Sequence, residues 1–254
     1  KAYKRERPKA LVKAVDLPPS RKTAAVADLL VAETLRDPGC VEVGHVHGQR
    51  WGVGLAEQPF PPQDSPTDGA MSLGPDDVVV VTGAAGSIVA AITADLARAS
   101  HGSFHLLDLT PEPDPADPDL RAYVEDRDAF RSVLAARMKD RGERPTPVAI
   151  EKELAHFERL AAALAAIDAV REAGGHVEYH SVDLTDSAAV SSVLRRVRQS
   201  SQRIDLLLHA AGVEVSRTLP GKEPREFDLV HDVKADGWFN VLTAAGDLPI
   251  GATV

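Results

Sequence analysis

The sequence contains a single cysteine, Cys40, in 254 residues. One thiol excludes a disulfide within the chain and a metal site built from several cysteines. No apolar run approaches the roughly 20 residues that a membrane-spanning helix needs. The basic start of the chain is not followed by the long apolar stretch of a secretion signal. We therefore expect a cytoplasmic protein without a membrane partner.

The sequence also lacks a basic block, and its formal net charge is -9. This balance argues against nucleic acid as a partner. Hydrophobic residues make up 44% and charged residues 26% of the chain, which is ordinary for a globular protein. The length allows one large core or two modest ones.

A proline-rich stretch at 57–77 divides the chain. It carries five prolines and two glycines, few of which can continue a helix or strand, and we interpret it as a linker. Before it, residues 23–37 have helical spacing with Thr23 as the expected cap, and residues 40–57 alternate like a strand pair that turns at 47–49. One helix and one hairpin are too little for an independent core, so this segment must pack on something else.

Strand and helix patterns alternate after the linker. Strands are predicted at 78–83, 103–109, 176–184 and 204–212, and helices at 87–100, 187–199 and 226–245. This alternation predicts an α/β fold, a doubly wound parallel sheet of Rossmann type over residues 78–254. An insert at about 110–155 separates the second and third strands. It begins with an acidic, proline-rich loop at 110–120 and continues as helix up to a stop at Gly174 and Gly175.

The turn TGAAGSIV at 82–89 connects the first predicted strand to a helix. Gly83 permits a sharp turn, Gly86 permits close approach of a pyrophosphate, and the helix that opens near Ser87 supplies free N–H groups. Such a turn alone is weak support for nucleotide binding, because many are only tight connections. Val89 stands where a third glycine is often found.

Three further features fall at the carboxyl ends of predicted strands, where open α/β sheets bind ligands. Asp108 is placed to accept hydrogen bonds from a ribose diol, with a helix cap or loop carboxylate as the less favoured alternative. Asp183 is placed to meet an adenine edge. The small residues that end LLLHAAGV, at 206–213, leave room for a flat nicotinamide.

Together these motifs resemble the short-chain dehydrogenase/reductase superfamily, and within it the ketoreductase domains of type I polyketide and polyunsaturated-fatty-acid synthases. HAAGV with His209, FDLVHDVKADGWFNVLTAA at 227–245, RPTPVAIEKEL at 144–154 and VEVGHVHGQRWGVGLAE at 41–57 carry the resemblance. It covers residues 23–254 and implies that residues 1–56 are the end of a preceding structural subdomain.

The resemblance implies a ketoreductase that reduces β-ketoacyl thioesters on an acyl carrier protein, beside other domains of the same synthase. It gives Lys234 a catalytic role, in which lysine lowers the pKa of a tyrosine that protonates the ketone oxygen. Without this context, Lys234 is best interpreted as a solvated helix charge. The implied cofactor-binding residues are Thr82, Gly83, Ala85, Gly86, Ser87, Ile88, Asp108, Leu109, Asp183, Leu184, His209, Ala210, Ala211 and Gly212.

Two departures from the family pattern stand out. Asp108 and Leu109 occupy the place of a Ser-Arg pair whose arginine meets the 2′-phosphate of NADPH. A carboxylate repels that phosphate, so we expect NADH to be favoured, although NADPH is the family default. In addition, the family's serine and tyrosine normally lie beyond the final LPIGATV. We therefore expect a sheet that is incomplete at its C-terminal end and a chain that alone lacks an intact reduction site.

Two interpretations of the function remain open. The chain is either a region of an active ketoreductase or a catalytically inactive, reductase-like structural module of a megasynthase; His209 and Lys234 disfavour an unrelated free-standing dehydrogenase.

We expect His45 and His47 on one face of a strand, where they could form half of a metal site, but the sequence places no third ligand. We therefore predict no metal.

Overall fold

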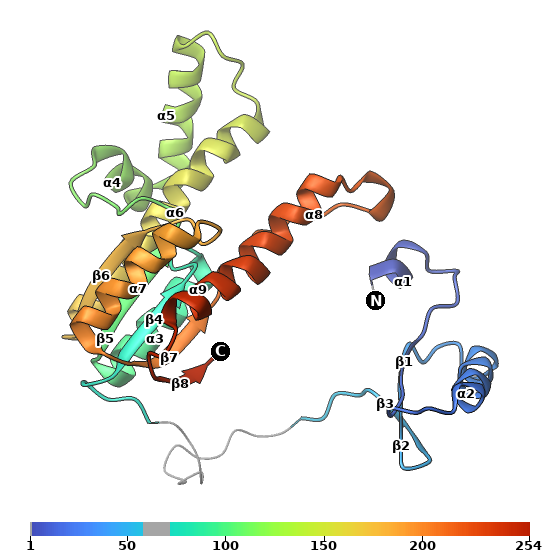
Figure 1. Cartoon of the computed structure of the whole chain (residues 1–254). Helices are drawn as coiled ribbons and strands as arrows, with labels where there is room; N and C mark the ends of the chain where they lie inside the picture. Colours follow the sequence, from blue (N-terminus) through green and yellow to red (C-terminus); the bar gives the residue numbers. More distant parts are fainter. Residues whose placement is uncertain (1, 58–71) are drawn as a thin grey trace. The chain divides into compact units, whose positions relative to one another are not determined.

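The structure, a computed structural model, describes residues 2–57 and 72–254 (Figure 1). It divides into two compact units. One contains residues 2–57 and 216–222, and the other contains residues 72–215 and 223–254. Most of the predicted linker, residues 58–71, lies outside the described residues.

The smaller unit is built on a three-stranded sheet in the order β1-β2-β3. Its elements are α1 (Ala2–Glu6), β1 (Ala14–Asp16), α2 (Thr23–Leu35), β2 (Glu42–Val46) and β3 (Gln49–Gly52), with η1 (Leu219–Gly221) from the later segment. The predicted helix and strand pair are confirmed, while α1 and β1 were not predicted. The hairpin turns at His47 and Gly48, which both have positive φ.

A buried carboxylate joins α2 to this hairpin. Glu33 is 2% exposed, and its Oε1 accepts a hydrogen bond from Arg50 Nε at 2.7 Å and pairs with His45 Nε2 at 3.1 Å. Arg50 Nη2 and Lys13 Nζ contact Oε2 at 3.0 and 3.3 Å. The Arg50 guanidinium is the main reason that the pKa of Glu33 falls to about 2. The contacts with Arg50, His45 and Lys13 therefore offset the desolvation cost of burying the Glu33 carboxylate.

Two predictions about this unit are wrong. Thr23 is the first helical residue and caps nothing; the N-cap position belongs to Lys22, without a side-chain hydrogen bond. His45 and His47 do not share a strand face, because β2 ends at Val46 and His47 lies in the turn with φ 51°. His45 is instead a partner of Glu33.

The larger unit contains one five-stranded parallel sheet in the order β6-β5-β4-β7-β8. Its strands are β4 (Val78–Thr82), β5 (Ser103–Asp108), β6 (His176–Ser181), β7 (Ile204–His209) and β8 (Ile250–Thr253). The predicted doubly wound, Rossmann-like fold is confirmed. The first four strands end one to three residues before the predicted limits, because the chain leaves the sheet to form the loops of the site.

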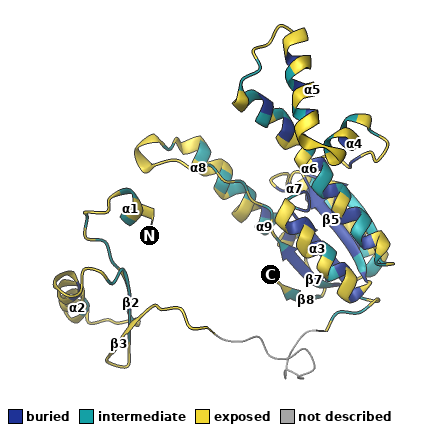
Figure 2. Ribbon diagram, turned by 180° about the vertical axis from the view of Figure 1, so that it is seen from behind, coloured by how far each residue is buried: buried dark blue, intermediate teal, exposed yellow. Residues whose placement is uncertain are grey.

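Helices cover both faces of this sheet (Figure 2). α3 (Ser87–Ser100) and α6 (Pro147–Glu172) pack on the face that receives Val79 and Val81, whereas α7 (Ser187–Ser201) and α9 (Gly237–Ala245) pack on the face that receives Val80. All three valines are 0% exposed. A continuous β-branched run is what a central parallel strand requires, because it is buried on both sides.

The insert between β5 and β6 forms α4 (Pro118–Glu125), α5 (Arg127–Asp140) and α6. α5 and the start of α6 project past the sheet (Figure 1). They share a small apolar core of Phe130, Leu134, Met138, Ile150 and Leu154. The expected loop at 110–120 is only partly exposed, since Thr110 and Leu120 are buried. The predicted stop is confirmed: α6 ends at Glu172 and Gly174 has φ 82°.

The predicted helix at 226–245 is present but interrupted. α8 (Pro224–His231) leads into one π-helical turn, η2 (Asp232–Asp236), and then into α9. π turns inside helices frequently mark functional positions, and this one carries Lys234.

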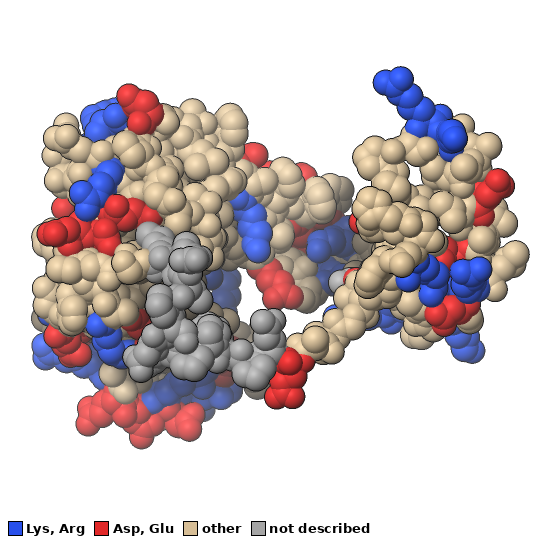
Figure 3. Space-filling view, turned by 90° about the horizontal axis from the view of Figure 1, so that it is seen from below, with Lys and Arg blue, Asp and Glu red and all other residues tan. Residues whose placement is uncertain are grey.

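The visible face in Figure 3 mixes acidic and basic side chains without a field of one sign. No helix in the described part of the chain is both long enough and apolar enough to cross a bilayer.

Candidate functional site

The loops that follow β4 and β7 meet at Gly83. This residue has φ 73°, in the left-handed region that favours glycine. A Cβ built on it would lie 2.8 Å from both the Cα and the N of Ala211. The two loops are therefore packed backbone against backbone, and no other residue type fits at this position.

The turn continues through Gly86 into the first turn of α3. Gly86 is the N-cap and makes no side-chain hydrogen bond, so the first amides of the helix remain open to a ligand. A Cβ on Gly86 would lie 3.2 Å from Gly83 O, which adds a packing reason for glycine. Ala85 is buried, and Ile88 is 75% exposed at the start of the helix.

The Asp108 carboxylate ties the end of β5 to this turn. Its Oδ2 accepts a hydrogen bond from Ala85 N at 2.9 Å, and its Oδ1 accepts one from Thr110 N at 2.8 Å. The side chain is held in place, with only 6% of the residue exposed. Each oxygen keeps one lone-pair direction for a ribose hydroxyl. Asp108 therefore also has the loop-holding role that the alternative interpretation of the sequence gave it.

A cleft opens over the carboxyl ends of β4, β5, β6 and β7. This is the topological switch point of the sheet, because the chain runs from β4 to β5 and β6 on one side and to β7 on the other. Nine predicted cofactor residues line it: Gly83, Gly86, Asp108, Leu109, Asp183, Leu184, Ala210, Ala211 and Gly212.

The cleft also contains residues that were not predicted. Arg159 lines it from α6, and Val182, Val213 and Val233 supply apolar walls. Arg159 forms no ion pair within the described residues. Helical spacing alone does not tell which residue of the long insert reaches the end of the sheet, so the sequence carried no signal for Arg159.

A chain of hydrogen bonds connects β4 with the helix that carries Lys234. His209 Nε2 lies 3.1 Å from Lys234 O, which only accepts, so this ring nitrogen carries the proton. Burial lowers the pKa of His209, and in the neutral ring Nδ1 accepts from Thr82 Oγ1 at 2.9 Å. Thr82 Oγ1 in turn accepts from Ala211 N at 3.2 Å. Thr82 and His209 therefore hold the HAAG loop rather than line the cleft.

The Lys234 side chain crosses the end of this loop. A Cβ on Gly212 would lie 2.7 Å from Lys234 Cε and 3.6 Å from its Nζ. The two residues are in close contact only because position 212 is glycine. Lys234 also lines a second hollow with His209, Ala235, Trp238, Thr253 and Val254. The side chain makes no ion pair with a described residue and is exposed.

The remaining predicted residues lie apart from the cleft or at its rim. Asp183 is exposed, and its Oδ1 accepts from the N and Oγ1 of Thr185. Ser87 lines a separate hollow between α3 and α6. Tyr123 packs in the insert core against Phe130, and Tyr179 donates to Thr110 O at 3.0 Å. Neither tyrosine lines the cleft or the hollow beside Lys234.

Comparison with known proteins decides the family. The model of the KR domain family matches residues 78–254. The chain belongs to the KR domain family. Its KR region has the fold and the motifs of the short-chain dehydrogenase/reductase superfamily, so the resemblance noted in the sequence is confirmed.

Relatives of this KR domain occur in multidomain synthases. Over 173 residues the chain is 28% identical to one of the subunits of a polyunsaturated fatty acid synthase from Thraustochytrium sp., covering 66% of this chain and 6% of that protein. It therefore spans only a small part of the curated relative that it matches.

Two solved structures share the fold over 99% of this chain. A ketoreductase domain from the bacillaene assembly line aligns with TM-score 0.62 and 18% identity over 48% of its own chain. An N-terminal ketoreductase from a macrolactin assembly line aligns with TM-score 0.57 and 14% identity over 40% of its own chain. At these identities the likeness establishes the fold alone.

Proposed function

We propose that this KR domain binds a nicotinamide dinucleotide in the cleft at the switch point, as part of a ketoreductase acting on β-ketoacyl groups. The supporting observation is the convergence of nine predicted cofactor residues from four loops on one cleft. The acyl groups would be carried as thioesters by an acyl carrier protein of the same synthase. Residues 1–56 are then the end of a structural subdomain that precedes the reductase fold.

Within the cleft, the open amides at the start of α3 would hold the pyrophosphate. The small residues Ala210, Ala211 and Gly212 leave the backbone accessible to the nicotinamide end. Lys234, in contact with Gly212, would lie beside the reacting carbon. When bound, the cofactor supplies the hydride, and the protein supplies position and charge.

Gly83→Ala tests this placement. The added Cβ meets the backbone of Ala210 and Ala211 below 3.0 Å, so the two loops must separate and the cleft must deform. We expect NADH or NADPH affinity to fall at least about tenfold, equivalent to about 1.4 kcal/mol, as measured by nicotinamide fluorescence.

Gly142→Ala is the matched control for this variant. Gly142 also has positive φ, 76°, but nothing lies within 4 Å of its added Cβ, so the backbone strain is similar and the clash is absent. Cofactor affinity should be unchanged in the control. If both variants bind like the wild type, the cofactor does not use this turn.

We further propose that Arg159 recognises the 2′-phosphate of NADPH. The expected preference for NADH rests on an Asp108 carboxylate facing the ribose and on the absence of a nearby arginine in the following sequence. Each Asp108 oxygen already accepts a hydrogen bond from a backbone amide, and Arg159 lines the same cleft. A guanidinium is well suited to a phosphate and offsets the repulsion from the carboxylate.

Arg159→Ala should therefore change the affinities for the two cofactors differently. NADPH affinity should fall about 10- to 150-fold, in line with the loss of a charge-assisted hydrogen bond, while NADH affinity changes less than about twofold. Lys152→Ala removes a charge from the same helix outside the cleft and should affect neither. Equal losses for both cofactors, or an unchanged NADPH affinity, would remove Arg159 from this role and leave Asp108 to set an NADH preference.

A further inference from the structure

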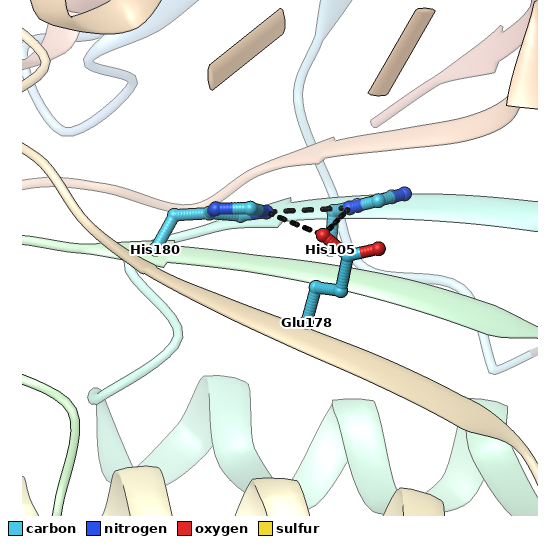
Figure 4. A group of neighbouring side chains, drawn as sticks. All are labelled: His105, Glu178 and His180. Carbon is cyan, nitrogen blue, oxygen red and sulfur yellow. Dashed lines mark hydrogen bonds and ion pairs between the residues drawn. The ribbon is translucent and has the colours of Figure 1, made fainter. Parts of the chain in front are cut away.

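A second cluster of polar side chains lies on β5 and β6, away from the strand ends that form the cleft. His105 is opposite Glu178 in the register of the two parallel strands, and His180 follows two residues later on the same face of β6. In Figure 4 the imidazoles of His105 and His180 meet edge to edge, with the Glu178 carboxylate beside the meeting point. These three side chains are the only group with metal-ligand geometry in the described part of the chain.

The distances between the ligand atoms suit a small cation. His105 Nδ1 lies 3.3 Å from His180 Nε2, and each lies 4.0 Å from Glu178 Oε2. Zinc binds imidazole nitrogens at about 2.0–2.1 Å, so two tetrahedral ligands are separated by about 3.3–3.4 Å. The two nitrogens already have this separation, and the carboxylate needs to approach by only about 0.6 Å.

Burial and charge favour the same interpretation. His105 and His180 are 1% and 6% exposed, so their ring nitrogens are shielded from water. Their facing nitrogens, His105 Nδ1 and His180 Nε2, share a hydrogen bond, so one of them carries a proton, which moves to the other nitrogen of that ring when a metal binds. Glu178 supplies one negative charge, and Arg196 is the nearby cation that opposes it at His180.

The site also has an entry path. The Glu178 side chain is 38% exposed, and its other oxygen, Oε1, pairs with the exposed His176 at 3.5 Å. His176, Glu178 and His180 alternate along β6 and so share one face of the edge strand. A cation can therefore reach the buried nitrogens past Glu178, with water available at a fourth position.

We propose that His105, Glu178 and His180 bind one divalent transition-metal ion, with Zn²⁺ as the best match to two imidazoles and one carboxylate. The ion would fasten the edge strand β6 to β5. No metal is predicted from the sequence because His105 lies 73 or more residues before the other two ligands and only the strand register joins them. This inference does not depend on the cofactor proposal.

The test uses the 254-residue chain, stripped of metal with a chelator and then titrated with Zn²⁺ by calorimetry and with Co²⁺ by visible absorption. We expect one equivalent of Zn²⁺ and a Co²⁺ spectrum of low-symmetry, four- or five-coordinate type. Glu178→Gln keeps the side-chain shape and should weaken Zn²⁺ binding at least about tenfold. His180→Asn should abolish the Co²⁺ spectrum.

Glu158→Gln and His156→Asn, both exposed on α6, are the matched controls and should bind like the wild type. Circular dichroism reports whether each variant folds. Glu178→Gln alone decides the question if His180→Asn does not fold, because its side chain is partly exposed. Absence of an equivalent of bound Zn²⁺, or binding that Glu178→Gln leaves unchanged, would overturn the proposal.

Discussion

At the scale of single residues, the neutral His209 ring is held through both of its nitrogens near the proposed cofactor site. Its two nitrogens have different partners, since one donates to Lys234 O and the other accepts from Thr82 Oγ1. The ring also packs on Trp238, with centroids 5.1 Å apart. Protonation would place a second N–H against the Thr82 hydroxyl and charge a partly buried ring. The HAAG loop is thus built for an uncharged residue at this position.

This arrangement predicts an acid-dependent loss of stability. The folded-state pKa of His209 is lowered by burial, so its contribution is fully present above the unfolded value of about 6.5 and declines as pH falls below it. His209→Asn retains an acceptor and a donor but cannot titrate. We expect the free energy of unfolding to fall less between pH 7 and pH 5 in this variant than in the wild type.

Urea unfolding at both pH values measures this difference. His156→Asn is the control, because His156 is exposed on α6 and should not change the pH dependence. An identical fall in His209→Asn and wild type would show that His209 is not held neutral by the fold.

At the scale of elements, the two units are held together differently. An ionic contact positions the helix of the smaller unit, whereas the larger unit has an apolar core. α2 exposes Leu29, Leu30, Val31 and Leu35, and Glu33 is its only buried residue. The carboxylate connects α2 to β2 through His45, to β3 through Arg50 and to the segment before β1 through Lys13. Lys13 Nζ also donates to Arg36 O. The helix position is therefore set by charge-assisted hydrogen bonds.

Glu33→Gln should loosen this unit selectively. The amide cannot neutralise Arg50 or Lys13, so we expect faster hydrogen exchange of backbone amides in α2, β2 and β3, with exchange in β4 and β5 unchanged. Because the pKa of Glu33 falls from 4.5 to about 2, the wild-type contact is complete above pH 4.5 and weakens as pH falls from 4.5 towards 2.

Hydrogen exchange read by mass spectrometry is the measurement. Asp28→Asn removes an exposed carboxylate from the same helix and should behave like the wild type. Protection of β2 that survives Glu33→Gln would show that apolar packing holds the hairpin.

The same scale shows what the sequence could predict. The valine run of β4 and the turn at Gly83 were predictable because periodicity and small residues constrain the backbone locally. The π turn at Lys234, the backbone contacts of Asp108 and the placement of Arg159 in the cleft were not. Each depends on how one element packs against another far along the chain, and neither propensity nor spacing encodes that approach.

At the scale of the whole molecule, the groups that the proposed reduction requires are unevenly placed. The cleft collects the predicted cofactor residues, and Lys234 lies beside a hollow whose other lining side chains, the neutral His209 among them, carry no charge. Tyr123 and Tyr179 are committed elsewhere, the first in the insert core and the second under the loop at Thr110. Reduction of a ketone requires a proton at oxygen as well as a hydride at carbon. We infer that the proton donor is not among these two tyrosines.

The 254-residue chain is accordingly expected to bind NADPH without reducing a β-ketoacyl thioester mimic. Loss of a positioned general acid typically removes about 10² to 10⁴ in rate, which would leave turnover below detection in an assay of NADPH absorbance. If the wild-type chain does reduce the thioester mimic, turnover measured in Lys234→Ala tests whether the reaction depends on this lysine. Turnover that disappears in the variant would show that proton transfer depends on Lys234, whereas turnover that persists would show that the donor acts without this lysine.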